Sequence, residues 1–150
     1  MRYLAIDLGA RRTGVAAGDD ATRIVTPLEV IDAADPGTRD RRLLQLIEEH
    51  GPGALVVGLP LDNRPGQKQP EGPAARLARA FAGHIQKLAG LPVRLADERL
   101  SSFAADVQMQ QSGLTRGRKK QRRDALAAAA ILRDFLAARG RDADKKERGD

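Results

Sequence analysis

Acidic residues at three separate places in the sequence could together bind a divalent metal ion. Asp7 ends a short apolar run near the N-terminus, and Asp97 and Glu98 end another. Ligands in open α/β sheets gather at the carboxyl ends of strands, where these acids are expected. Asp124 is in phase with the apolar residues that follow it at helical spacing, so it is expected to face the core. If the carboxylates converge, a divalent metal ion is the natural partner, because burying them together without a cation is costly.

Each acid taken alone also has a purely structural explanation. Asp7 could accept hydrogen bonds from the turn that follows it, and the acid pair could form an ion pair with the neighbouring Arg99. Asp124 could complement the positive N-terminal end of its helix. The metal hypothesis therefore depends on the three positions meeting in space.

Positive charge is concentrated directly before Asp124. The formal net charge is +6, and six basic residues between positions 116 and 123 equal it. A concentrated basic patch is typical of proteins that bind polyanions, so this stretch, expected to be a loop, would hold phosphates beside the metal. A solvated loop without a partner is the alternative. We call these residues the basic stretch: Arg116, Arg118, Lys119, Lys120, Arg122 and Arg123.

The composition is typical of one soluble domain. The chain has 150 residues, of which 41% are hydrophobic and 31% charged, and no apolar run is long enough to cross a bilayer. Asp7 interrupts any signal-peptide core, so a cytoplasmic protein is expected. The protein is expected to be a monomer or a homodimer. Cysteine is absent, which excludes thiolate metal sites and cysteine nucleophiles. His50 and His84 look like ordinary helix residues.

The elements that position these residues form a mixed α/β pattern. Three closely spaced strands predict an antiparallel meander, and the alternation of helices and strands after them predicts parallel crossovers, hence a mixed five-stranded sheet flanked by helices. Residues 1–139 are expected to form the domain, and the charged residues 140–150 a disordered tail. The expected strands are 3–8, 13–17, 24–26, 54–58 and 93–96, and the expected helices are 39–50, 73–89, a short one within 101–113, and one from 123 or 124 to before Gly140.

Two details of this pattern bear on the site. The helix 73–89 carries apolar residues at helical spacing, and its expected core-facing stripe is Leu77, Ala78, Phe81, Ile85 and Leu88. The segment 58–72, rich in proline, glycine and polar residues, is either a substrate flap or a plain connection.

Four blocks of sequence, in this order, resemble the YqgF/RuvX family of RNase H-like nucleases. The Gly-Leu-Pro and Asp-Glu-Arg-Leu blocks make the resemblance specific. The blocks are Leu4-Ala5-Ile6-Asp7-Leu8-Gly9 with Gly14-Val15-Ala16, then Val56-Val57-Gly58-Leu59-Pro60, then Asp97-Glu98-Arg99-Leu100-Ser101, then Lys119-Lys120 with Asp124-Ala125-Leu126-Ala127-Ala128.

The resemblance implies an RNase H-like fold and phosphodiester hydrolysis with two Mg²⁺ or Mn²⁺ ions. It implies that Asp7, Glu98 and Asp124 are the catalytic metal ligands, and that Asp97 and Arg99, which share the third block, either support these ligands or contact the substrate. The basic stretch, directly before Asp124, is expected to contact nucleic acid because of its charge and its position. The family is associated with processing of the 5′ end of the 16S ribosomal RNA precursor and, alternatively, with Holliday-junction resolution. Two readings from other classes stay open: a non-catalytic RNA-binding ribosome-assembly factor, and an actin-like ATPase fragment suggested by the glycine two residues after Asp7.

Overall fold

A five-stranded mixed sheet forms the centre of the molecule, with strand order β3-β2-β1-β4-β5. The computed structural model describes residues 1–60, 72–97, 116–147 and 149, with backbone alone over 116–124 and 142–147. Strands β1, β2 and β3 form the antiparallel meander, and β4 and β5 run parallel to β1. The predicted sheet is thus confirmed. The strands are β1 (Arg2–Asp7), β2 (Arg12–Asp19), β3 (Val25–Asp32), β4 (Ala54–Leu59) and β5 (Val93–Asp97); the helices are α1 (Pro36–His50), α2 (Pro73–Ala89) and α4 (Arg116–Glu147).

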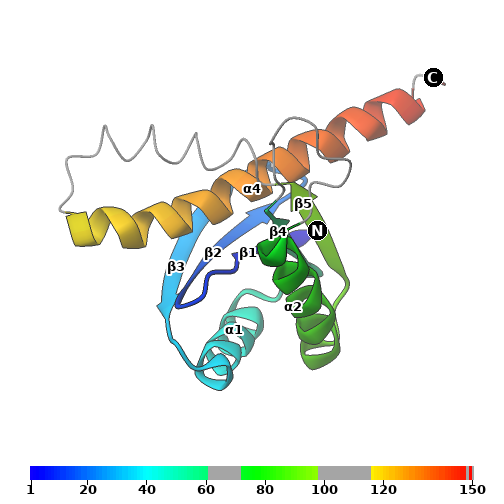
Figure 1. The fold of residues 1–150 in the computed structure, drawn as a ribbon. Helices are drawn as coiled ribbons and strands as arrows, with labels where there is room; N and C mark the ends of the chain where they lie inside the picture. Colours follow the sequence, from blue (N-terminus) through cyan, green and yellow to red (C-terminus); the bar gives the residue numbers. More distant parts are fainter. Residues whose placement is uncertain (61–71, 98–115, 148, 150) are drawn as a thin grey trace.

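The helices cover the two faces of the sheet separately, as Figure 1 shows. Alternate residues of β1 supply the two cores, because successive strand side chains point to opposite faces. Leu4 and Ile6 are buried against α1 and α2, whereas Tyr3 and Ala5 are buried against α4. We call these two sides the α2 face and the α4 face.

Helix α4 differs most from expectation. The basic stretch, predicted to be a loop, forms its first turns, and the helix continues through Gly140 to Glu147. Arginine, lysine and glutamine are good helix formers, and Gly117 and Gly140 cost only about 1 kcal/mol each within a helix. Local propensity therefore outweighs the charge and the two glycines. The expected short helix within 101–113 and the segment 61–71 lie outside the described residues.

The predicted apolar stripe of α2 is partly wrong. Leu77 and Leu88 are 66% and 45% exposed, respectively. The buried stripe contains small residues at the same helical spacing, which let the helix approach the sheet closely; it consists of Ala75, Ala78, Phe81, Ala82 and Ile85.

An ion pair with two hydrogen bonds joins α1 to the edge strand β3. Arg42 donates from Nε and Nη2 to the two carboxylate oxygens of Glu29, at 2.8 and 2.7 Å. These hydrogen bonds from Arg42 lower the pKa of Glu29 below its usual value. The folded state therefore binds the proton less readily than the unfolded chain does.

Glu29→Gln is expected to destabilise the protein modestly at pH 7. The stabilisation from a lowered carboxyl pKa is present above the unfolded value of 4.5 and disappears as the pH falls through the folded value. Urea unfolding of both proteins from neutral to acidic pH should show the difference shrinking on acidification. Glu48→Gln, at an exposed site of α1, is the control, and a pH-independent difference would contradict the assignment.

Candidate active site

Asp7 is the last residue of β1, at the edge of the sheet where parallel strands β1, β4 and β5 all end. Strand alternation gives it the parity of Tyr3 and Ala5, whose side chains pack on the α4 face. The residue is half-buried. Asp7 is therefore a carboxylate at the carboxyl edge of the sheet, on the side that α4 covers.

Glycines occupy the positions on both sides of Asp7. Gly14 of β2 is its direct antiparallel partner. In β4, Ile6 pairs with Val57, so Gly58 is the next position along and lies beside Asp7. Both glycines are buried. No side chain from the neighbouring register positions of the adjacent strands therefore competes with an ion or phosphate for the space around this carboxylate.

The turn after Asp7 depends on Gly9. A Cβ atom at this position would overlap the backbone carbonyl oxygen of Arg12. The turn can bring β2 back beside β1 in this form only without a side chain at position 9. The geometry of the turn therefore explains this glycine, and its spacing from Asp7 does not by itself indicate nucleotide binding.

Gly9→Ala is expected to lower the free energy of unfolding by about 1–3 kcal/mol, because backbone must move to relieve the overlap. Gly140→Ala is the matched control. Its Cβ would meet only the end of the flexible Arg23 side chain, and alanine favours the helix by up to about 1 kcal/mol. Urea unfolding measures both variants, and equal effects would rule out the steric explanation.

Arg12 is a basic residue that sequence reasoning did not select for the site. It starts β2 and has the parity of Gly14 and Ala16, hence of the α4 face. Its Nε is buried and has no hydrogen-bond partner among the described residues. Arg12 is half-buried and two positions before Gly14, the strand partner of Asp7. An arginine with an unpartnered Nε at this place suits an anionic ligand.

The other predicted acids are described less fully. Asp97 ends β5, and alternation gives it the parity of Val93, which packs on the α2 face, rather than of Ala96, which packs on the α4 face. Glu98 and Arg99 lie outside the described residues. Among the described side chains, no group of three potential metal ligands occurs. The convergence of Asp7, Glu98 and Asp124 stays a prediction.

The position of Asp124 within α4 removes one structural explanation for it. The residue lies eight positions after Arg116, about 12 Å into the helix. Interactions with the helix dipole fall off within the first turn, so Asp124 does not complement the helix N-terminus. The stripe in phase with it is buried as predicted, with Ala127, Ala128 and Ile131 at most 8% exposed.

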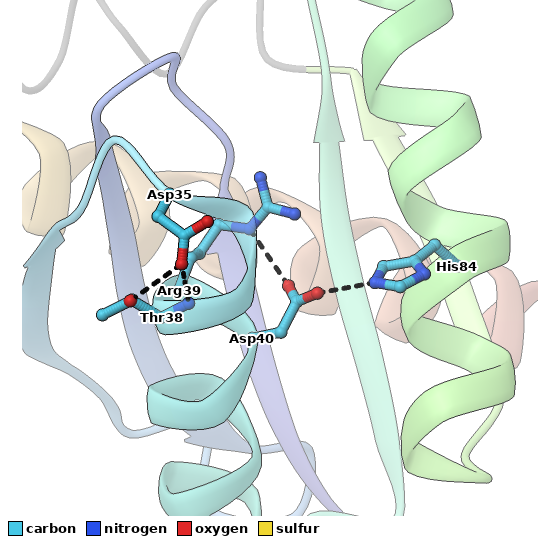
Figure 2. A network of polar contacts seen from close by, with 5 residues as sticks. All are labelled: Asp35, Thr38, Arg39, Asp40 and His84. Atoms are coloured by element: carbon cyan, nitrogen blue, oxygen red, sulfur yellow. Dashed lines mark hydrogen bonds and ion pairs between the residues drawn. The ribbon is translucent and has the colours of Figure 1, made fainter.

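A second polar cluster, shown in Figure 2, joins α1 to α2. Asp40 accepts a hydrogen bond from Arg39 Nε at 3.1 Å, and its other oxygen lies 2.7 Å from His84 Nε2. Asp35 caps α1 by accepting hydrogen bonds from the Thr38 backbone and hydroxyl, both at 3.0 Å. Sequence reasoning treated His84 as an ordinary helix residue, and nothing in the sequence indicates a contact with a residue 44 positions away.

Comparison with known proteins assigns a family. The family model "RuvX: Holliday junction resolvase" matches residues 1–138. A protein of Anaeromyxobacter sp. (strain Fw109-5), named "Putative pre-16S rRNA nuclease", is 42% identical over 142 residues, covering 93% of this chain and 98% of its own. A protein of Chloroflexus aurantiacus (strain ATCC 29366 / DSM 635 / J-10-fl) with the same name is 40% identical over 136 residues, covering 91% of this chain and 86% of its own.

Solved structures show the same fold. Thermus thermophilus RuvC in complex with a Holliday junction substrate superposes with a TM-score of 0.57 at 22% identity, covering 93% of this chain and 95% of that one. The fowlpox virus Holliday junction resolvase gives 0.54 at 11% identity, covering 92% and 99%. The architecture is thus RuvC-like and RNase H-like. None of the helices in the described part of the chain is long and apolar enough to span a membrane.

Proposed function

The chain belongs to the RuvX family of nucleases, and we propose that it hydrolyses nucleic-acid phosphodiesters with two Mg²⁺ or Mn²⁺ ions bound by Asp7, Glu98 and Asp124. One observation carries this proposal. Asp7 ends β1 between two buried glycines, on the face covered by the helix that contains Asp124. Family membership also excludes the alternative that the chain is a fragment of an actin-like ATPase.

The direction of α4 supports a meeting of Asp124 with Asp7. Phe135 packs edge-on against Tyr3 with ring centroids 5.5 Å apart, and Arg139 lies over the same ring. Asp124 precedes Phe135 by eleven residues, about 16 Å of helix. Asp7 follows Tyr3 by four residues, about 13 Å of strand. Further along α4, Gly140 lies against the Arg23 side chain, in the turn after β2 at the N-terminal end of β1. The helix therefore runs away from the Asp7 edge, and the similar spans support a position for Asp124 near Asp7.

The alternation of β5 favours Glu98 over Asp97 as a ligand. Position 96, directly before Asp97 in β5, has the parity of the α4 face. Asp97 has the opposite parity. We therefore assign the metal-binding role to Glu98, with Asp97 outside the ligand set.

The donor set fits the proposed ions. Carboxylate oxygens are the ligands that Mg²⁺ and Mn²⁺ prefer, and the glycines beside Asp7 leave room for an ion and a phosphate. When bound, two such ions supply an activated water and stabilise the leaving oxygen. The protein residues hold the carboxylates in place, and Arg12, with its unpartnered Nε, contributes positive charge toward the substrate phosphate.

The basic stretch and Arg99 are proposed to bind the nucleic-acid backbone. Positions 116, 119, 120 and 123 share one side of α4 by helical spacing, and they immediately precede Asp124. Replacing the six basic residues of this stretch with glutamine is expected to weaken binding of all sequences and to flatten its salt dependence. Binding titrations at several salt concentrations test this, and an unchanged slope would exclude the basic stretch from the interface.

The preferred substrate is the 16S ribosomal RNA precursor, because the curated relatives are named for it; its 5′ end is the part that the family resemblance implies. A Holliday junction is the second candidate, since the family model and the RuvC fold are associated with junctions. The deciding experiment offers a labelled RNA precursor and a four-way DNA junction side by side, with Mg²⁺, Mn²⁺ or EDTA. Metal-dependent cleavage of the precursor supports the proposal, and cleavage of the junction alone supports the second candidate. RNA binding without cleavage in any metal would indicate a non-catalytic assembly factor.

A further inference from the structure

A groove of about 630 Å³ opens on the α2 face, beside the turn that follows Asp7. Its walls are the turn residues Leu8–Ala10, one side of α2 that carries Leu77 and His84, and Arg39 of α1. Figure 2 shows Arg39 and His84 approaching Asp40 from the two helices. The groove therefore lies between two helices fixed to each other by a polar contact, next to the candidate active site.

The lining of the groove is apolar and close to electrically neutral. Leu77 is 66% exposed, although it belongs to the apolar pattern of α2, so it is available for a ligand. The Arg39 guanidinium group stacks over the Phe81 ring, 4.8 Å from its centroid. Its charge is balanced by Asp40, to which it is hydrogen-bonded. A flat, neutral ligand matches this surface better than a phosphate does.

We propose that this groove receives an unpaired nucleobase of the substrate, from a nucleotide adjacent to the phosphate held at Asp7. The inference rests on the proposed nuclease function and specifies its substrate. Guanidinium planes and apolar side chains are the surfaces on which single-stranded bases stack. Gly9 lines the groove and is two residues after Asp7, so their Cα atoms are at most about 7.6 Å apart. A phosphate on the α4 side and a base on the α2 side would thus belong to one strand that crosses the carboxyl edge of the sheet.

This subsite implies that the substrate is single-stranded beside the cut. A base within a duplex is already stacked and paired, and moving it into a groove costs a few kcal/mol. An RNA precursor with an unpaired segment at the cleavage position meets this requirement without cost. The groove therefore favours single-stranded flanks over fully paired junction arms.

The test measures binding of a short single-stranded RNA and of an abasic strand of the same length and charge, by fluorescence anisotropy. The full chain keeps Asp7, Ca²⁺ replaces Mg²⁺ as the carboxylate-bound ion, and gel electrophoresis after each titration verifies that the strands are uncut. Leu77→Asn removes the exposed apolar wall, and Ala80→Leu narrows the groove without adding a ring on which a base could stack. Each is expected to weaken binding of the intact RNA by at least about fivefold and to leave binding of the abasic strand unchanged. Leu88→Asn, at an exposed leucine of α2 that does not line the groove, should have no effect.

The proposal is overturned if both strands lose affinity equally, if neither does, or if Leu88→Asn matches Leu77→Asn. It is also overturned if the groove variants change only thermal stability, which would indicate that another part of the chain fills the groove. Because the readout is binding, the outcome is separate from that of the nuclease proposal. Base-dependent binding without any cleavage by the unmutated chain would retain the subsite and reject the nuclease.

Discussion

Asp7→Asn is expected to reduce the rate of metal-dependent cleavage by at least about a thousandfold. The metal ions contribute several kcal/mol of charge stabilisation in the transition state, and each 1.36 kcal/mol corresponds to a factor of about ten in rate. The asparagine has nearly the shape of aspartate but lacks its charge, so it should fit between Gly14 and Gly58 without binding the ions. Initial rates at saturating Mg²⁺ or Mn²⁺, with isothermal titration of the metal, measure both consequences.

The control for Asp7→Asn is Asp20→Asn. Asp20 lies at the opposite edge of the sheet, where it pairs with the N-terminal amine at 2.8 Å, so its loss should leave the cleavage rate within about twofold. The folded state should tolerate Asp7→Asn, because asparagine keeps the size of aspartate and a side-chain oxygen that can accept hydrogen bonds. Cleavage by Asp7→Asn within tenfold of the unmutated rate would contradict the proposed site, provided that its unfolding curve is unchanged.

Local patterns were sufficient to predict the parts of the site that depend on one element at a time. The apolar run before Asp7 predicts a strand ending there, and β1 ends at Asp7. The helical phase of Asp124 predicts a buried stripe, and Ala128 and Ile131 are fully or almost fully buried. Both predictions use a periodicity that the backbone itself imposes. They required no knowledge of neighbouring strands.

Features that depend on contacts between distant segments were not predictable from these patterns. The glycines flank Asp7 only because β2 and β4 adopt one particular register beside β1. The pairing of Asp40 with His84 requires α1 and α2 to lie side by side on the same face. Leu77 has the helical spacing of a core residue, yet α2 packs against the core along a stripe that leaves Leu77 exposed. Periodicity indicates which side of an element is apolar but not how wide its contact is.

Leu132→Ala is expected to lower the free energy of unfolding by about 2–5 kcal/mol, the usual cost of emptying a fully buried leucine site. Leu132 is 0% exposed, in the core between α4 and the sheet. Its side chain packs directly on Gly18, where a Cβ would be only 2.8 Å from Leu132 Cδ2. Because Gly18 has no side chain, it cannot fill the space that Leu132→Ala would leave. Leu88→Ala, at a leucine that is 45% exposed, should cost well under about 1 kcal/mol.

The same substitution separates docking of α4 from folding of the sheet. If Asp124 binds metal from α4, activity requires that this helix stay packed on β1 and β2, whereas the α2 face retains its own core. Leu132→Ala should therefore lose cleavage activity at a lower urea concentration than the one at which its sheet unfolds, because local opening needs less free energy than global unfolding. Activity and far-ultraviolet circular dichroism measured across one urea titration test this. Coincident loss of both signals would mean that α4 and the sheet form a single cooperative unit, and that the active site is as stable as the fold.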